Sequence, residues 1–210
     1  SFIVSLVKYN NNSISAVTTT GIPSGSLVHI KTLTASSSGT LSFVHGTDGV
    51  VLDSTYPIYK FEFINMHPAT DNVAFKFNAS TDSGSNYNVT KTTTWFRAFH
   101  HEDNSNAALG YDAGDDLAQG TGFQTIFTAL GGGSADESGS GTLTLYNPSS
   151  TTFAKHFIAD GNEYHVSNLT INIFAAGYMN TTSAVNAVRF QMSSGNIDAG
   201  KIKLYGIKDS

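Results

Sequence analysis

The sequence predicts an all-β protein, an antiparallel β-sandwich of the jelly-roll type. Apolar and polar residues alternate over many short runs, and this period of two suits strands that bury one face. Clusters of Gly, Asn, Ser and Pro bound those runs, as turn residues do between strands. No segment combines the period and the length of an ordinary helix. Many short strands with frequent turns are typical of sandwiches and jelly rolls.

The predicted strands follow one another along the whole chain. The alternation is clearest in residues 59–65 and 73–78, and segment 67–72 between them has the composition of a turn. We therefore expect these two strands to form a β-hairpin. Gly195-Asn196 is expected to form the turn between the last two strands. The predicted strands are 2–9, 27–34, 40–44, 58–66, 73–80, 94–100, 124–130, 141–147, 153–159, 171–178, 187–192 and 201–207.

Residues 26–210 are predicted to form a single jelly-roll-like domain, and residues 1–25 either an N-terminal arm or a first strand. Residues 102–122 are polar and interrupted by glycine, and a loop of this length is usually functional or a contact surface. Within it, residues 115–119 could form a single helical turn. The Gly- and Ser-rich segment 131–141 is expected to bend between strands rather than to separate domains.

Composition excludes several classes of function. Only 13% of the residues are charged, and the net charge is −5, which argues against nucleic acid as a partner because phosphate binding needs clustered Lys and Arg. The chain has no Cys, so disulfides and thiolate metal sites are excluded. No run approaches the roughly 20 apolar residues of a membrane helix. The first apolar run is too short for a secretory signal, so assembly in the cytoplasm is expected.

No catalytic residue, metal site or cofactor is predicted, and an enzyme is not expected. The segment His100–Asp103 holds ligand-type side chains, but in an extended strand neighbours point to opposite faces. Asp112, Asp115 and Asp116 lie among glycines without the spacing of an EF-hand. No nucleophile elbow with a strand before it and a helix after it is present. A calcium requirement remains open, because backbone and Asn oxygens bind calcium without a clear signature.

Aromatic residues have two alternative roles. Strand aromatics are expected to fill the core, whereas Tyr and Trp side chains on a sheet face or in a loop could stack on sugars beside amide and carboxylate groups. The expected core aromatics are Phe61, Phe63, Phe75, Phe77, Trp95, Phe96 and Phe190.

Four segments carry a resemblance to a known group of proteins. They are 49–56, 85–94, 147–152 and the closing stretch that ends in Lys203-Leu-Tyr-Gly-Ile207. In this order they resemble small β-rich structural proteins from the virions of marine tailed bacteriophages, of the pelagiphage and cyanophage types. The similarity extends from about Lys31 to the C-terminus. The resemblance implies a virion structural protein and brings no functional residues with it.

The first hypothesis is a capsid decoration (cement) protein that bridges neighbouring capsomers on the virion surface. A homotrimer is expected, because capsid lattices and fibres offer threefold positions. The partner would be the major capsid protein or a tail component. The apolar N-terminal run is the predicted docking segment, through Phe2, Ile3, Val4, Leu6 and Val7.

The alternative is a knob associated with a tail fibre or spike that recognises a host surface glycan. Position in loops and side-chain type suggest its contact residues, which are Tyr111, Asp112, Asp115, Asp116 and Tyr164. A third hypothesis is a depolymerase, which needs two acids converging on one cleft.

Overall fold

The computed structural model describes residues 26–209, and this part of the chain is all-β, with no residue in a helix. The strand predicted at residues 2–9 lies outside the described residues. The strands are β1 (Leu27–Thr34), β2 (Leu41–Val44), β3 (Ile58–Pro68), β4 (Val73–Ser80), β5 (Lys91–His101), β6 (Ala107–Tyr111), β7 (Gln124–Leu130), β8 (Gly139–Tyr146), β9 (Lys155–His165), β10 (Leu169–Met179), β11 (Ala187–Met192) and β12 (Ile197–Ile207).

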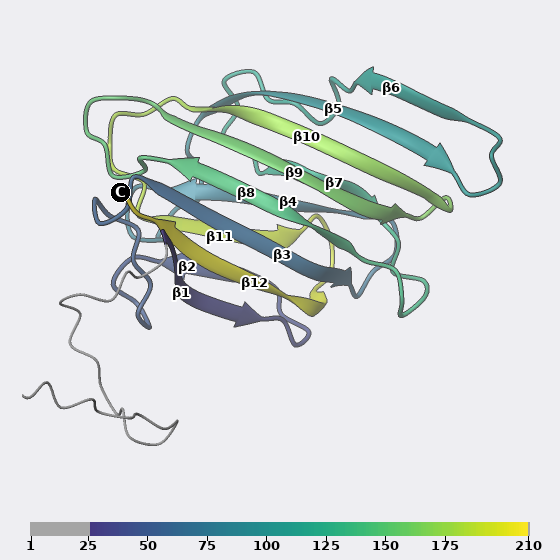
Figure 1. Cartoon of the computed structure of the whole chain (residues 1–210), viewed down its shortest axis with the longest axis horizontal. Helices are drawn as coiled ribbons and strands as arrows, with labels where there is room; N and C mark the ends of the chain where they lie inside the picture. The colour runs from purple at the N-terminus through teal and green to yellow at the C-terminus, as the bar shows by residue number, and fades with distance from the viewer. Residues whose placement is uncertain (1–25, 210) are drawn as a thin grey trace, which may run out of the picture.

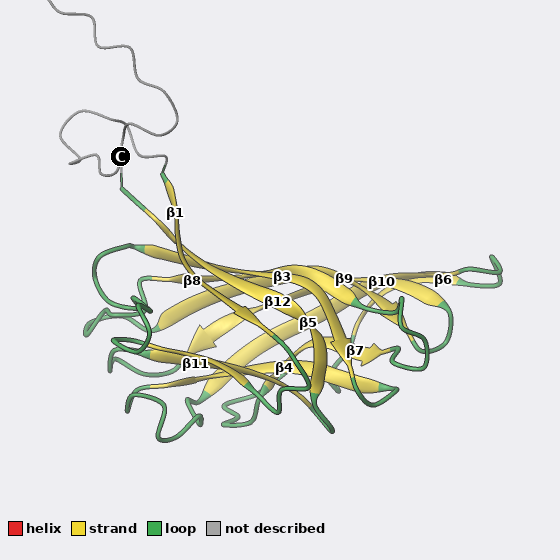
Figure 2. Cartoon of the chain, turned by 90° about the horizontal axis from the view of Figure 1, so that it is seen from below, coloured by secondary structure: helices red, strands yellow, loops and turns green. Residues whose placement is uncertain are grey.

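All strand pairs are antiparallel, and the strands lie in two layers (Figure 1, Figure 2). The long layer has the order β1-β12-β3-β8-β9-β10-β5-β6, and the short layer has the order β2-β11-β4-β7. At one side Leu130 of β7 pairs with His165 of β9, and at the other an isolated bridge joins Ser38 to Ile197. The sheet therefore nearly closes on itself into a barrel-like shape.

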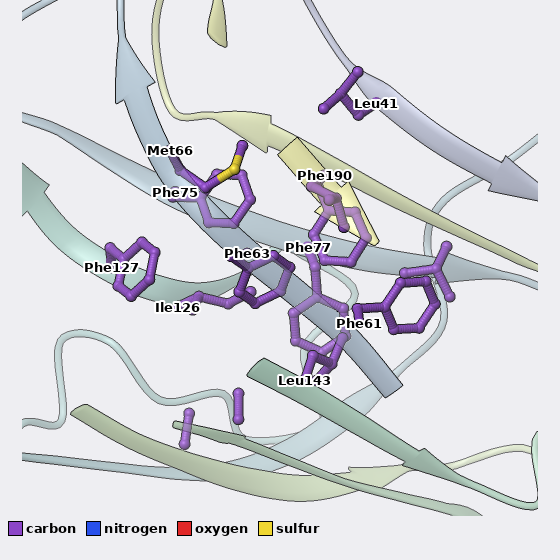
Figure 3. Close-up of a cluster of buried hydrophobic side chains, with 14 of the residues drawn as sticks. Leu41, Phe61, Phe63, Met66, Phe75, Phe77, Ile126, Phe127, Leu143 and Phe190 are labelled. Carbon is purple, nitrogen blue, oxygen red and sulfur yellow. The ribbon is translucent and has the colours of Figure 1, made fainter. Parts of the chain in front are cut away.

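The space between the layers is filled by aromatic and aliphatic side chains (Figure 3). Phe190 of β11 lies at their centre, with ring centroids 5.3 Å from Phe61, 5.2 Å from Phe63 and 5.9 Å from Phe75. Each of these rings stands at an inward position of its strand, and β3 shows the alternating burial most clearly. The alternation in the sequence therefore has the expected cause, a sheet face buried against another.

The predicted hairpin of residues 59–65 with 73–78 is wrong. β3 pairs with β12 and β8, whereas β4 pairs with β11 and β7, so the two strands belong to different layers. Both strands turn an aromatic face inward, and Phe63 meets Phe75 edge to face at 5.3 Å. The two strands pack with their sheet faces together. This packing replaces the hydrogen-bonded pairing, strand edge to strand edge, that a short connection suggests.

Two glycines allow the layers to approach closely near β7. A Cβ on Gly139 would lie 2.7 Å from the Phe127 ring, and a Cβ on Gly161 would lie 2.8 Å from it. The ring therefore packs against strand backbone, in the place that side chains occupy elsewhere. A larger residue at either position would have to displace the ring.

The prediction of an all-β, antiparallel protein is confirmed, and the remaining strand predictions match observed strands, with β5, β9, β10 and β12 longer than predicted. Strand β6 was missed, since it lies in the segment predicted as a loop, and the suggested helical turn at 115–119 is wrong. All residues of β6 are exposed, so no alternation marks it, and backbone pairing with β5 alone defines it. In residues 26–209 no helix of membrane-spanning length and hydropathy occurs.

Candidate functional site

The candidate site is the exposed face of β9, β10, β5 and β6, which we call the outer face. The described residues include seven exposed large apolar side chains, and five of them lie here. Singly exposed apolar residues are ordinary, but a contiguous group of them marks a surface that contacts something. The five are Phe96, Leu109, Tyr111, Ile158 and Phe174.

Strand register brings these side chains together. Phe96 pairs with Phe174 on one side and with Tyr111 on the other, and residues directly opposite each other share a sheet face. The Phe96 and Phe174 rings stack with centroids 5.3 Å apart and an interplanar angle of 14°. Leu109 pairs with Ala98, two residues farther along β5. The result is an apolar strip that crosses β10, β5 and β6, and Ile158 of β9 lies beside it, opposite Ala176 of β10.

The strip ends at a strand with an unpaired side. Within the described part of the chain β6 pairs with β5 alone, and it extends beyond the rest of the long layer (Figure 1, Figure 2). Its other side presents backbone N–H and C=O groups to the surroundings. Such an edge can accept another strand, and proteins usually protect it with charge, proline or a covering segment. Ala107–Tyr111 contains neither charge nor proline.

The outer face carries little charge. Asp160 is the one carboxylate among its described residues, and its Oδ1 accepts a hydrogen bond from the Thr142 hydroxyl at 2.5 Å. No Lys or Arg occurs on the outward positions of these strands. The outward positions are 92, 94, 96, 98 and 100 of β5, 107, 109 and 111 of β6, 156, 158, 160, 162 and 164 of β9, and 170, 172, 174, 176 and 178 of β10.

Four of the five residues predicted for glycan contact lie together at the end of β6. The Tyr111 hydroxyl donates a hydrogen bond to the Asp116 carboxylate, which raises the pKa of Tyr111. Asp112 pairs with the Arg97 guanidinium at 3.3 Å. The Thr128 hydroxyl donates to Asp115 Oδ2 at 3.1 Å, and this bond joins the loop after β6 to β7.

Tyr164 lies apart from that group. The register places it three strands across the sheet and four residues along it, roughly 20 Å from Tyr111 by strand spacing and rise. It lines a separate hollow of about 380 Å³ with His100, Glu102 and Asp136 among the lining residues. One small ligand could not contact all five predicted residues.

A buried carboxylate lies on the inward side of the same strands. Glu163 of β9 is fully buried, and its Oε2 accepts the Thr128 N–H at 2.8 Å. Burial raises the pKa of the Glu163 carboxyl to about 7, while the N–H groups of Thr128 and Ala129 and the Arg97 charge partly oppose that rise. Its Oε1 has no hydrogen-bond partner among the described residues. A protonated carboxyl suits this environment best.

Other predicted sites fall elsewhere. His100–Asp103 ends β5 and enters the turn before β6, and in residues 26–209 no group of three or more His, Asp or Glu side chains is arranged to hold a metal ion. The predicted docking residues Phe2, Ile3, Val4, Leu6 and Val7 lie outside the described residues.

Sequence reasoning missed most of the outer face. The Phe96 prediction is wrong, since Phe96 is exposed whereas Trp95 and the other five predicted core aromatics are buried. One signal was available: consecutive residues of a strand face opposite ways, so Trp95 and Phe96 cannot both point inward. Nothing in the sequence marked Phe174 or Glu163, because their surroundings come from strands distant in the chain.

Comparison with known proteins identifies no relative. No protein-family profile, no curated protein and no solved structure matches the chain.

Proposed function

We propose that the chain is a phage virion structural protein with a jelly-roll fold, acting as a capsid decoration protein. The support for the fold is strand order. When β5, β6, β9 and β10 are left out, the other eight strands form two four-stranded layers, β1-β12-β3-β8 and β2-β11-β4-β7. Numbered one to eight along the chain, these layers read 1-8-3-6 and 2-7-4-5, which is the order of two interlocked Greek keys.

In this proposal the remaining four strands are two insertions into the same layer. β5 and β6 come between the fourth and fifth strands, β9 and β10 between the sixth and seventh, and together they widen the long layer. The widened part carries the outer face. An insertion that adds exposed apolar area suits assembly better than stability, because it leaves rings such as Phe96 and Phe174 in water.

The proposed occupant of the outer face is a second copy of the chain within a homotrimer. The apolar group of five side chains is the observation that carries this proposal. Its near absence of charge favours a self-association surface, because few charges would lose water when two copies meet. It disfavours nucleic acid, which would require cations there. The resemblance to marine phage proteins supplies the virion context, and threefold assembly is common in that setting.

The test is the oligomeric state of the full chain by sedimentation equilibrium, together with a variant carrying Phe96→Ser and Phe174→Ser. We expect a trimer for the original chain and a folded monomer for the variant. Phe153→Ser is the control, since Phe153 is exposed in the loop before β9 and is not one of the outward strand positions of the outer face, and it should leave the trimer intact. A monomeric original chain at all soluble concentrations would overturn the proposal.

Copy number in the virion tests the decoration role independently. Quantitative mass spectrometry of purified virions should find the chain in numbers on the order of hundreds, near those of the major capsid protein. About a few dozen copies would instead indicate a tail or vertex position. Deletion of residues 1–23 tests the predicted docking segment: capsid binding should be lost while the trimer persists.

A second candidate function is recognition of a host surface glycan. The observation in its favour is the combination of open rings on Phe96, Phe174 and Tyr111 with the Asp116 carboxylate at one end. Binding on a glycan array that is lost in Tyr111→Ala and retained in Tyr164→Ala would support it, because the two tyrosines lie far apart. Absence of binding by the original chain would eliminate it.

A further inference from the structure

Lys91 and Asn78 form an unusual buried contact. Both side chains are fully buried, and Lys91 Nζ lies 2.5 Å from Asn78 Oδ1. Asn78 belongs to β4 in the short layer, and Lys91 begins β5 in the long layer. These strands are not paired with each other, so the contact joins separate parts of the sheet.

We propose that the Lys91 amine and the Asn78 carboxamide react with each other to form an intramolecular isopeptide bond. The reaction would make this pair a self-modification site that ties β4 covalently to β5. It requires three conditions: an uncharged amine, a polarised carbonyl and a fixed approach. The described residues around the pair bear on each of them.

The first condition is a neutral amine, since an ammonium has no lone pair with which to attack. Burial lowers the pKa of Lys91 to about 7, and among the described residues no carboxylate contributes to hold the charge. Lys91 Nζ donates to Asn78 Oδ1 and to the Val89 carbonyl at 2.7 Å. Two acceptors match the two N–H groups of a neutral amine and leave its lone pair unused.

The second condition is a carbonyl whose oxygen is stabilised as it gains charge. Asn78 Oδ1 also accepts the backbone N–H of Ala79 at 2.8 Å. A fixed N–H aimed at an oxygen that becomes negative lowers the barrier to attack, most of all where water is excluded. The Asn78 amide nitrogen donates to three carbonyls, those of Tyr87 at 2.7 Å, Thr121 at 2.9 Å and Gly122 at 3.3 Å. These bonds fix the plane of the carboxamide.

The third condition is a fixed approach of the two groups. Lys91 exchanges both backbone hydrogen bonds with Gly120, at 2.8 and 2.9 Å. Asn78 lies within β4, where it pairs with Arg189 of β11. With both backbones held, the two side chains are already in contact before the reaction. Such preorganisation supplies much of the rate of intramolecular reactions.

The reaction balances without an oxidant or another reactant. The Nζ lone pair forms a bond to Asn78 Cγ, and the C=O π electrons move to Oδ1. As the carbonyl re-forms, the Cγ–Nδ2 bond breaks, and one proton from Nζ ends on Nδ2. The products are a secondary amide between the two side chains and one molecule of ammonia.

The bond would act on this chain as a disulfide acts on others. It would close the segment between residues 78 and 91, which connects the two layers, and restrict the unfolded chain. The chain has no Cys and cannot form a disulfide. A covalent tie between layers would also resist forced separation of the sheet.

The test is the intact mass of the purified full-length chain, followed by tandem mass spectrometry of a digest. We expect a mass lower than the sequence mass by one ammonia and a branched peptide that joins Lys91 to Asn78. Lys91→Met should have its full sequence mass. Lys155→Met is the matched control, because Lys155 is also buried but donates to the carbonyls of Phe153 and Thr181, both at 3.0 Å, and it should still lose ammonia.

Three further outcomes are decisive even if the Lys91→Met variant does not fold. If the original chain is only partly converted, conversion at pH 8 should be about tenfold faster than at pH 6, following the neutral fraction of an amine with a pKa of about 7. A chain that keeps its full mass after prolonged incubation at pH 8 would overturn the proposal. So would an ammonia loss that maps to a linear peptide.

Discussion

The two parts of the long layer differ in the rings that they expose and in the charged side chains that they bury. In β3, β8 and β12, which face the short layer, the Phe rings lie inside and the Lys60–Glu62 pair is partly exposed. In the extension formed by β5, β6, β9 and β10, stacked rings face outward, and Glu163, Lys91 and Lys155 are buried. The alternation of residues along the strands is the same in both parts. Both parts contribute to the core, and the extension adds an exposed apolar face and buried Lys and Glu side chains that the first part lacks.

The largest effect should come from the aromatic core. Phe190→Ala removes the ring that contacts Phe61, Phe63 and Phe75, and we expect it to lower the free energy of unfolding by about 3–5 kcal/mol. Urea unfolding measures this loss. Phe153→Ala, at an exposed loop position, is the control and should change stability little. A loss no larger than that of the control would mean that the core does not depend on this ring.

Glu163→Gln should stabilise the protein at high pH. The folded state raises the pKa of Glu163 from 4.5 to about 7, so it favours the protonated form. The contribution of this group is complete below pH 4.5 and is lost as the pH rises through about 7. The variant keeps a neutral group at all pH values and should gain about 3 kcal/mol relative to the original chain at pH 8.

Urea unfolding of both proteins at pH 4 and pH 8 gives the Glu163→Gln comparison. The difference between them should be small at pH 4 and should grow towards pH 8. An equal difference at both pH values would show that Glu163 does not titrate in this range. The extension would then not contain the buried titrating group that distinguishes it from the core.

Phe96→Ala tests whether the outer face contributes to folding. Phe96 is 40% exposed and stacks on Phe174, so we expect a loss of about 1 kcal/mol, in the range of an aromatic pair. A double-mutant cycle with Phe174→Ala should assign most of that loss to the pair. A loss as large as that of Phe190→Ala would remove the distinction between the two regions.

The smallest effect on stability is expected for Arg97→Met, about 0.5 kcal/mol from its partly exposed pair with Asp112. The useful result is a shift in pH dependence. The Arg97 charge lowers the pKa of Glu163, so its removal should move the loss of stability to higher pH. Lys60→Met is the matched control, because it breaks a similarly exposed 3.3 Å pair with Glu62 and should leave the pH profile unchanged.

Local pattern was sufficient for the individual strands. The boundaries of β4, β7 and β11 follow from runs of strand-forming residues between turn residues, and their inward aromatics follow from the period of two. Of the residues at the candidate site, the sequence predicted Tyr111 and, beside it, Asp112, Asp115 and Asp116. Phe96 and Trp95 show the limit, because the pattern required them to face opposite ways but did not say which would point inward.

The sequence by itself determined an all-β antiparallel chain, the positions of most strands and the aromatic composition of the core, since these depend on residues adjacent in the chain. Only the tertiary structure decided that β3 and β4 face each other across the core, that β6 extends the sheet beside β5, and that Lys91 meets Asn78. The physical reason is that a strand offers the same backbone hydrogen bonds to any partner. Its neighbour is selected by the burial of side chains from the whole chain, which no local pattern records.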